Sequence, residues 1–177
     1  MALLQRIHHV AYRCRDAKET VEWYREHLQM DFVLAIAEDQ VPSTGAPDPY
    51  MHVFLDAGQG NVLAFFELPN APAMGRDTNT PDWVQHIAFK VDSLATLETA
   101  KQRLEAAGIA VVGPPAHTIL KASYFFDPSG HRLELAVDTA TPDMNARLDK
   151  VKWEMLEEWS RTKRAPKHAA WMHNQAR

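Results

Sequence analysis

The chain has 177 residues, of which 46% are hydrophobic and 24% charged, and its formal net charge at pH 7 is −4. This composition is typical of a folded globular protein and excludes the disordered and fibrous classes. The sequence lacks the concentrated basic charge that is typical of nucleic-acid-binding proteins. It also lacks an apolar run of ~18 residues, the length of a membrane-spanning helix. The single cysteine, Cys14, excludes an internal disulfide and favours a reducing compartment. We therefore expect a soluble, cytoplasmic protein without nucleic-acid or membrane partners.

The first half of the chain predicts the order strand, helix, strand, strand, strand. Asp16, followed three residues later by Glu19, is a capping pattern that starts the helix. Prolines and a glycine between residues 38 and 49 predict a loop, and Gly58-Gln59-Gly60 predicts a hairpin turn. The predicted elements are strands at 7–14, 31–37, 50–57 and 61–68 and a helix at 16–29.

The second half repeats this order after a connecting segment at 69–81. Its helix is expected to stop at Gly108, because glycine readily takes the left-handed conformation that ends many helices. Asp127-Pro128-Ser129-Gly130 predicts a turn between two strands. The predicted elements are strands at 84–91, 109–112, 122–126 and 131–137 and a helix that follows Asp92-Ser93 and is stopped by Gly108.

The pattern changes again from Thr139 onwards. Pro142-Asp143 opens an amphipathic helix, and the tail carries three tryptophans, too many for a purely solvated segment. We expect this helix to pack on its own domain or on a partner subunit; a lid over the functional site is the alternative.

The strand at 7–14 and the strand at 84–91 match residue for residue, with His9 equivalent to His86. Because side chains alternate along a strand, both histidines lie on its less apolar face. A later strand in each half carries one carboxylate among apolar residues, Glu67 in the first and Glu134 in the second, where a solvated charge is not expected. Two imidazoles and two carboxylates suit one divalent ion such as Zn, Ni, Co, Fe(II) or Mn. His52 and His131 have no equivalent in the other half and receive no role.

These residues resemble the motif of the vicinal oxygen chelate superfamily: His9-Val-Ala with Glu67, then His86-Ile-Ala with Asp127-Pro-Ser-Gly and Glu134. That superfamily includes glyoxalase I, methylmalonyl-CoA epimerase, extradiol dioxygenases and bleomycin resistance proteins. The resemblance implies an α+β fold in which two βαβββ modules form a cupped mixed sheet around a metal site. The domains expected are a vicinal oxygen chelate domain at 1–138, with module one at 6–68 and module two at 83–138, and a C-terminal helical extension at 139–177.

The resemblance implies metal-dependent proton transfer of the glyoxalase or epimerase type, in which the cation stabilises an enediolate of the substrate. Glu134 or Glu67 would then act as the base. We favour this chemistry because an octahedral ion with four protein ligands keeps two positions for adjacent substrate oxygens. Such an enzyme is a lyase or an isomerase.

An extradiol ring-cleavage dioxygenase is the rival. It would bind Fe(II) through His9, His86 and Glu134, and His117 and Tyr124 resemble the catalytic histidine and tyrosine of those enzymes. A drug-binding resistance protein without catalysis is the third possibility, although such relatives lack the ligand set.

The substrate is expected to be a small oxygenated molecule. Arg13 and Lys90 lie on the site-facing side of their strands, which suggests an anionic substrate, and Phe65 shares the side of Glu67 as an apolar wall. The apolar tail and the habit of the family favour a homodimer.

Overall fold

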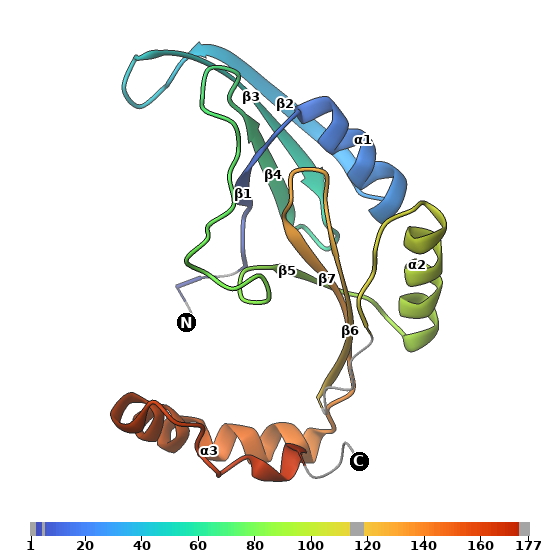
Figure 1. Cartoon of the computed structure of the whole chain (residues 1–177), viewed down its shortest axis with the longest axis vertical. Coiled ribbons are helices and arrows are strands. Elements are labelled where there is room, and N and C mark those ends of the chain that lie inside the picture. The colour runs from blue at the N-terminus through green and yellow to red at the C-terminus, as the bar shows by residue number, and fades with distance from the viewer. Residues whose placement is uncertain (1–2, 5, 114–118, 174–177) are drawn as a thin grey trace. The chain divides into compact units, whose positions relative to one another are not determined.

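The computed structural model describes residues 3–4, 6–113 and 119–173 and has the expected α+β composition (Figure 1). In chain order the elements are β1 (Val10–Cys14), α1 (Ala17–Leu28), β2 (Asp31–Gln40), β3 (Pro47–Asp56), β4 (Val62–Glu67), β5 (Ile87–Lys90), α2 (Leu94–Ala106), β6 (Leu120–Phe126), β7 (Arg132–Asp138), α3 (Pro142–Thr162) and the 3-10 helix η1 (Ala170–His173). The predicted fold class is confirmed. No helix in the described part of the chain is long and apolar enough to cross a bilayer.

The strands form a four-stranded sheet in the order β1-β4-β3-β2 and a three-stranded sheet in the order β5-β7-β6. When β5, β7 and β6 are taken as equivalents of β1, β4 and β3, the second sheet repeats the first without a counterpart of β2. Val112 makes an isolated antiparallel bridge with Tyr124 of β6, which is the pairing expected of that missing strand. The duplicated order predicted from the sequence is therefore present in the connectivity of both sheets, except for the strand predicted at 109–112.

The prediction of a strand at 109–112 is wrong, because this segment forms only a single bridge and no continuous ladder. Gly108 and Gly113 both have positive φ angles, +79° and +118°, and they enclose a segment too short to build a ladder. Only Val112 pairs with a neighbour.

The loop predicted at 38–49 is also wrong in extent, because β2 continues to Gln40 and β3 already begins at Pro47. The prolines are tolerated because β4 pairs with β3 only as far back as Met51, so this end of β3 has a neighbour on one side alone. The turn between the strands is closed by a hydrogen bond from the Val41 amide to the Ala46 carbonyl at 2.9 Å.

Helix α1 starts as the sequence predicts, since the Asp16 carboxylate accepts a hydrogen bond from the Glu19 amide at 2.8 Å. It buries one side against β2, β3 and β4, and its Tyr24 ring lies 5.1 Å from the ring of Phe65, centroid to centroid. The core of this sheet and helix includes Tyr24, Leu55, Leu63 and Phe65.

Helix α2 also ends as predicted. The amide of Gly108 donates to the Glu105 carbonyl, and the amide of Ile109 donates to the Leu104 carbonyl, both at 2.9 Å. These two bonds form a Schellman motif, which satisfies carbonyls that the helix end would leave unpaired.

Helix α3 opens at Pro142, as predicted, and the segment after it folds back along the same helix. Ala169 is buried, the Arg147 guanidinium lies 3.9 Å from the centroid of the Trp171 ring, and His168 lies within 4 Å of Glu158. Trp153 on α3 remains 68% exposed.

The chain divides into two compact units that interleave in sequence: Met1–Ile87 with Phe126–Leu133, and Ala88–Phe125 with Glu134–Arg177. The turn between β6 and β7 thus belongs to the first unit, whereas most of both strands belongs to the second. The domain limits predicted from the sequence stay a prediction.

Candidate functional site

The two histidines singled out by the repeat occupy equivalent places in the structure. His9 directly precedes β1 and His86 directly precedes β5, and both residues are exposed. The carboxylates lie on the strands beside them: Glu67 is the last residue of β4, which pairs with β1, and Glu134 lies in β7, which pairs with β5. His9, Glu67 and His86 belong to the first unit, and Glu134, which is buried, belongs to the second.

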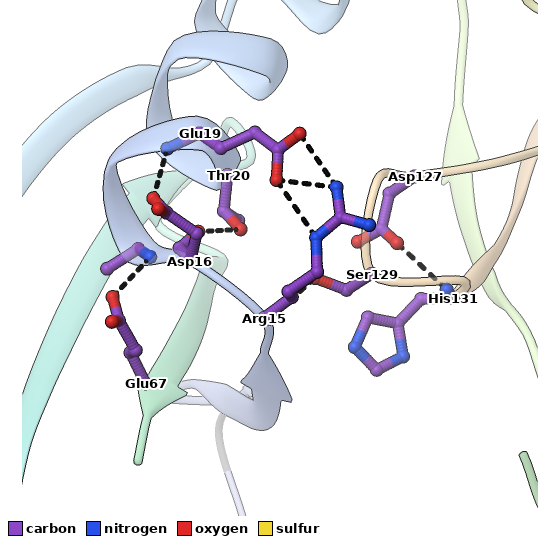
Figure 2. A network of polar contacts seen from close by, with 9 residues as sticks. Arg15, Asp16, Glu19, Thr20, Glu67, Asp127, Ser129 and His131 are labelled. Atoms are coloured by element: carbon purple, nitrogen blue, oxygen red, sulfur yellow. Dashed lines mark hydrogen bonds and ion pairs between the residues drawn. The ribbon is translucent and has the colours of Figure 1, made fainter. Parts of the chain in front are cut away.

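The carboxylate of Glu67 already has a partner within the first unit. Its Oε2 atom accepts a hydrogen bond from the Ala17 amide at 2.7 Å, so Glu67 points at the start of α1 (Figure 2). A negative charge at this end of a helix is stabilised by the helix dipole. Phe65 lies on the same side of β4 and is completely buried against Tyr24 of α1.

His9 lies against the other side of the sheet. Its ring contacts those of Phe54 and His52, with centroids 6.0 Å and 6.5 Å away, and its Nδ1 lies 2.8 Å from Nδ1 of His8. Within the first unit, the structure therefore does not bring the side chains of His9 and Glu67 together.

His52 is a residue that the sequence reasoning missed. It stacks on Phe66, its cross-strand partner, with ring centroids 3.6 Å apart, and it also contacts Phe54 at 4.0 Å. Only 9% of His52 is exposed, and burial, followed by the neighbouring His9, lowers its pKa, so the imidazole is neutral at pH 7. The signal that was missed is a polar residue inside an apolar strand. The same type of signal identified Glu67 as a candidate.

Both cations expected to bind the substrate have protein partners. The Arg13 guanidinium donates to the Pro72 carbonyl of the connecting segment at 2.6 Å, and Lys90 forms an ion pair with Asp138. These contacts compete with any anionic ligand at the two positions.

The residues predicted for dioxygenase chemistry divide between described and undescribed parts of the chain. Tyr124 is half-buried in β6, and its backbone pairs with Val112. His117 lies outside the described residues.

A second missed feature is the polar network around Asp127, of which Figure 2 shows the hydrogen bond with the His131 amide. Asp127 is 5% exposed, and its two oxygens accept hydrogen bonds from the Tyr24 hydroxyl at 3.0 Å and the His131 amide at 2.8 Å. His131 Nε2 donates to the Arg13 carbonyl at 2.7 Å. Burial raises the pKa of Asp127, and burial together with the Asp127 charge raises that of Tyr24. The sequence predicts the turn at Asp127 but contains no signal for its pairing with Tyr24.

The described residues contain no group of three or more His, Cys, Asp or Glu side chains placed to hold a metal ion. The predicted donors nevertheless have the chemistry of a divalent-ion site, since imidazole and carboxylate ligands suit Zn, Ni, Co, Fe(II) and Mn alike. The ligand set stays a prediction.

The fold contains a βαβββ repeat followed by a second repeat of the same order, in which the second strand is reduced to the bridge of Val112 with Tyr124. A family model described as the Glyoxalase/Bleomycin resistance protein/Dioxygenase superfamily matches residues 6–135, and the chain belongs to this superfamily. The resemblance inferred from the sequence motif is thereby confirmed.

Solved structures with the same fold include enzymes and a binding protein. A trypanothione-dependent glyoxalase I of Leishmania major is 19% identical, with a TM-score of 0.58 over 89% of this chain and 99% of that chain. A lactoylglutathione lyase of Agrobacterium tumefaciens is 21% identical, with a TM-score of 0.53 over 77% of this chain and 96% of that chain. TnmS3, an antibiotic-binding protein of Streptomyces sp. CB03234, is 18% identical, with a TM-score of 0.54 over 78% of this chain and 100% of that chain. No curated protein matches the sequence.

Proposed function

We propose that the chain is a divalent-metal-dependent enzyme of glyoxalase type that removes a proton next to a carbonyl group of a small oxygenated substrate. The observation that carries this proposal is the repeated placement of a histidine before β1 and β5 and of a carboxylate on the neighbouring strand of each. Both the residue types and their positions in the topology are repeated. Two histidines with unrelated structural roles would not be expected to occupy equivalent positions.

His9, His86 and Glu134 would hold the ion, which would supply Lewis acidity at the substrate oxygens. Glu67, the fourth residue of the predicted set, lies on the α1 side of the first sheet, whereas His9 lies on the other side. We assign the base to Glu134, because Glu67 points at the start of α1, on the side of the sheet opposite His9. The Glu134 carboxylate takes the proton in this assignment.

The engagement of Glu67 with α1 favours one second candidate function. Without Glu67, the remaining set of His9, His86 and Glu134 is the two-histidine, one-carboxylate set of Fe(II) extradiol dioxygenases. Of the two further residues that resemble catalytic residues of those dioxygenases, Tyr124 lies in the described part of the chain, on β6.

Metal analysis and assays separate these functions. We expect the purified protein to bind about one divalent ion per chain and to convert the hemithioacetal of methylglyoxal and glutathione after loading with Zn²⁺, Ni²⁺, Co²⁺ or Mn²⁺. Replacing a ligand removes most Lewis-acid catalysis, so His86→Ala should lower kcat/KM by about 100-fold or more.

His27→Ala is the matched control, because His27 lies on α1 and contacts Trp23 rather than any candidate ligand. A yellow ring-fission product from catechols with Fe(II) and air would favour the dioxygenase instead. A protein that binds none of these ions would be a binding module, as TnmS3 is described to be.

A further inference from the structure

The side of the four-stranded sheet that faces away from α1 carries a cluster of rings around His52. His52 pairs with Phe66 across β3 and β4, whereas the α1 side of these strands carries Val53 and Phe65. Phe54 and Phe66 contact the His52 ring, and both remain half-buried, so part of each phenyl ring is accessible. The cluster therefore offers an apolar surface of phenyl rings with one imidazole between them.

The Nε2 atom of His52 is buried and has no hydrogen-bond partner among the described residues. A neutral imidazole has one donor and one acceptor nitrogen, and a buried polar atom without a partner carries a free-energy penalty. Core histidines normally avoid this penalty by bonding to backbone or side-chain groups. Within the described residues nothing satisfies this nitrogen, which leaves it open to a partner from outside the chain.

We propose that this face binds a small molecule with a flat apolar portion and an oxygen atom, and that His52 Nε2 hydrogen-bonds that oxygen. Phe54 and Phe66 contact the carbon frame of the ligand. Nε2 is covered in this structure, so a ligand reaches it only when a neighbouring side chain turns aside. The ring of His9, whose centroid lies 6.5 Å from that of His52, belongs to an exposed neighbour on this face. In linking this face to His9, the proposal rests on the proposed function, for which it names a substrate-binding residue and a substrate class.

Benzohydroxamate is a suitable probe, because it joins a flat ring to two adjacent oxygens. Histidine-ring NMR of ¹⁵N-labelled protein, treated with chelator and again with Zn²⁺ added, reports directly on the imidazole nitrogens. We expect the probe to shift the His52 ring signals, which are assigned by their loss in His52→Phe. Calorimetry should show about tenfold weaker binding to His52→Phe, since the phenyl ring keeps the stacking and loses only the hydrogen bond.

His52→Gln should restore part of the affinity, because its amide can still hydrogen-bond an oxygen, and it provides a second test if His52→Phe folds poorly. His27→Phe should bind like the wild type. Unchanged His52 signals at saturating probe, equal affinity of His52→Phe, or no binding of benzohydroxamate to the wild type would each overturn the proposal. A shift of His52 in a protein that binds no metal would reject the metal enzyme and leave this site standing; metal binding without an effect at His52 would do the reverse.

Discussion

Asp127 shows how a single buried side chain holds the first unit together. It accepts a hydrogen bond from the hydroxyl of Tyr24, which lies 103 positions away in the sequence. It also accepts a hydrogen bond from the amide of His131 in its own turn. A buried carboxylate is unfavourable unless its oxygens accept hydrogen bonds, and here both do. The residue therefore connects the β6–β7 turn to the helix that covers the first sheet.

Asp127→Ala should lower the free energy of unfolding by about 2–4 kcal/mol, because it leaves the Tyr24 hydroxyl and the His131 amide without their acceptor. Asp127→Asn should cost less, since its amide oxygen can accept from His131 while its amide nitrogen donates to the Tyr24 oxygen. Urea unfolding at neutral pH measures both values. Equal stability of the alanine variant and the wild type would contradict the packing described.

The same carboxyl predicts a pH dependence. Burial raises its pKa above the ordinary value of 3.8, so the folded protein binds this proton more tightly than the unfolded chain. The stability of the wild type relative to Asp127→Asn is therefore highest below that ordinary pKa and falls as pH rises through the folded-state pKa. Urea unfolding of both proteins from about pH 4 to about pH 7 tests this, and a difference that grows with pH would have the wrong sign.

At the scale of the element, the end of α2 depends on one backbone conformation. Gly108 has a φ of +79°, and nothing lies within 4 Å of the position where a Cβ would be. Gly108→Ala should therefore cost about 1 kcal/mol from backbone strain alone. Gly75→Ala is the matched control, because it also has open space but no positive φ. Chemical denaturation measures both, and equal effects would show that the Schellman motif is not the cause.

The C-terminal segment folds back on α3 through Trp171, whose ring makes a cation–π contact with the Arg147 guanidinium. Trp171→Ala should lower the local opening free energy by about 1–2 kcal/mol and leave the global melting temperature nearly unchanged. Hydrogen exchange at the Ala170 and Met172 amides, which bond to Lys167 and Ala169, reports this opening. Trp153→Ala removes an exposed ring and should leave this exchange unaltered.

At the scale of the whole molecule, local signals account for much of the fold. The cap at Asp16, the glycine at Gly108 and the alternation in the strands act over a few residues, and the elements that they predict are present apart from the strand at 109–112. The strand lengths depend on neighbours instead: β3 starts at Pro47 because this end lies beyond β4. No local pattern contains that information.

The candidate site follows the same division. The places of His9 and His86 follow from a repeat that is visible in the sequence, and the structure has both directly before equivalent strands. The hydrogen bond of Glu67 with Ala17 joins residues 50 positions apart and depends on how α1 packs on β4. The sequence likewise cannot show that His52 Nε2 is enclosed without a partner among the described residues, because that depends on rings from other strands.

The first compact unit is not one continuous half of the gene, because it includes Phe126–Leu133. A fragment that stops at Ile87 would lack Asp127, and the Tyr24 hydroxyl would lose its acceptor in the middle of the core. Splitting the coding sequence at the boundary of the internal repeat should therefore not yield two self-sufficient proteins, and an ancestral single repeat would have needed a second polypeptide to complete its interior.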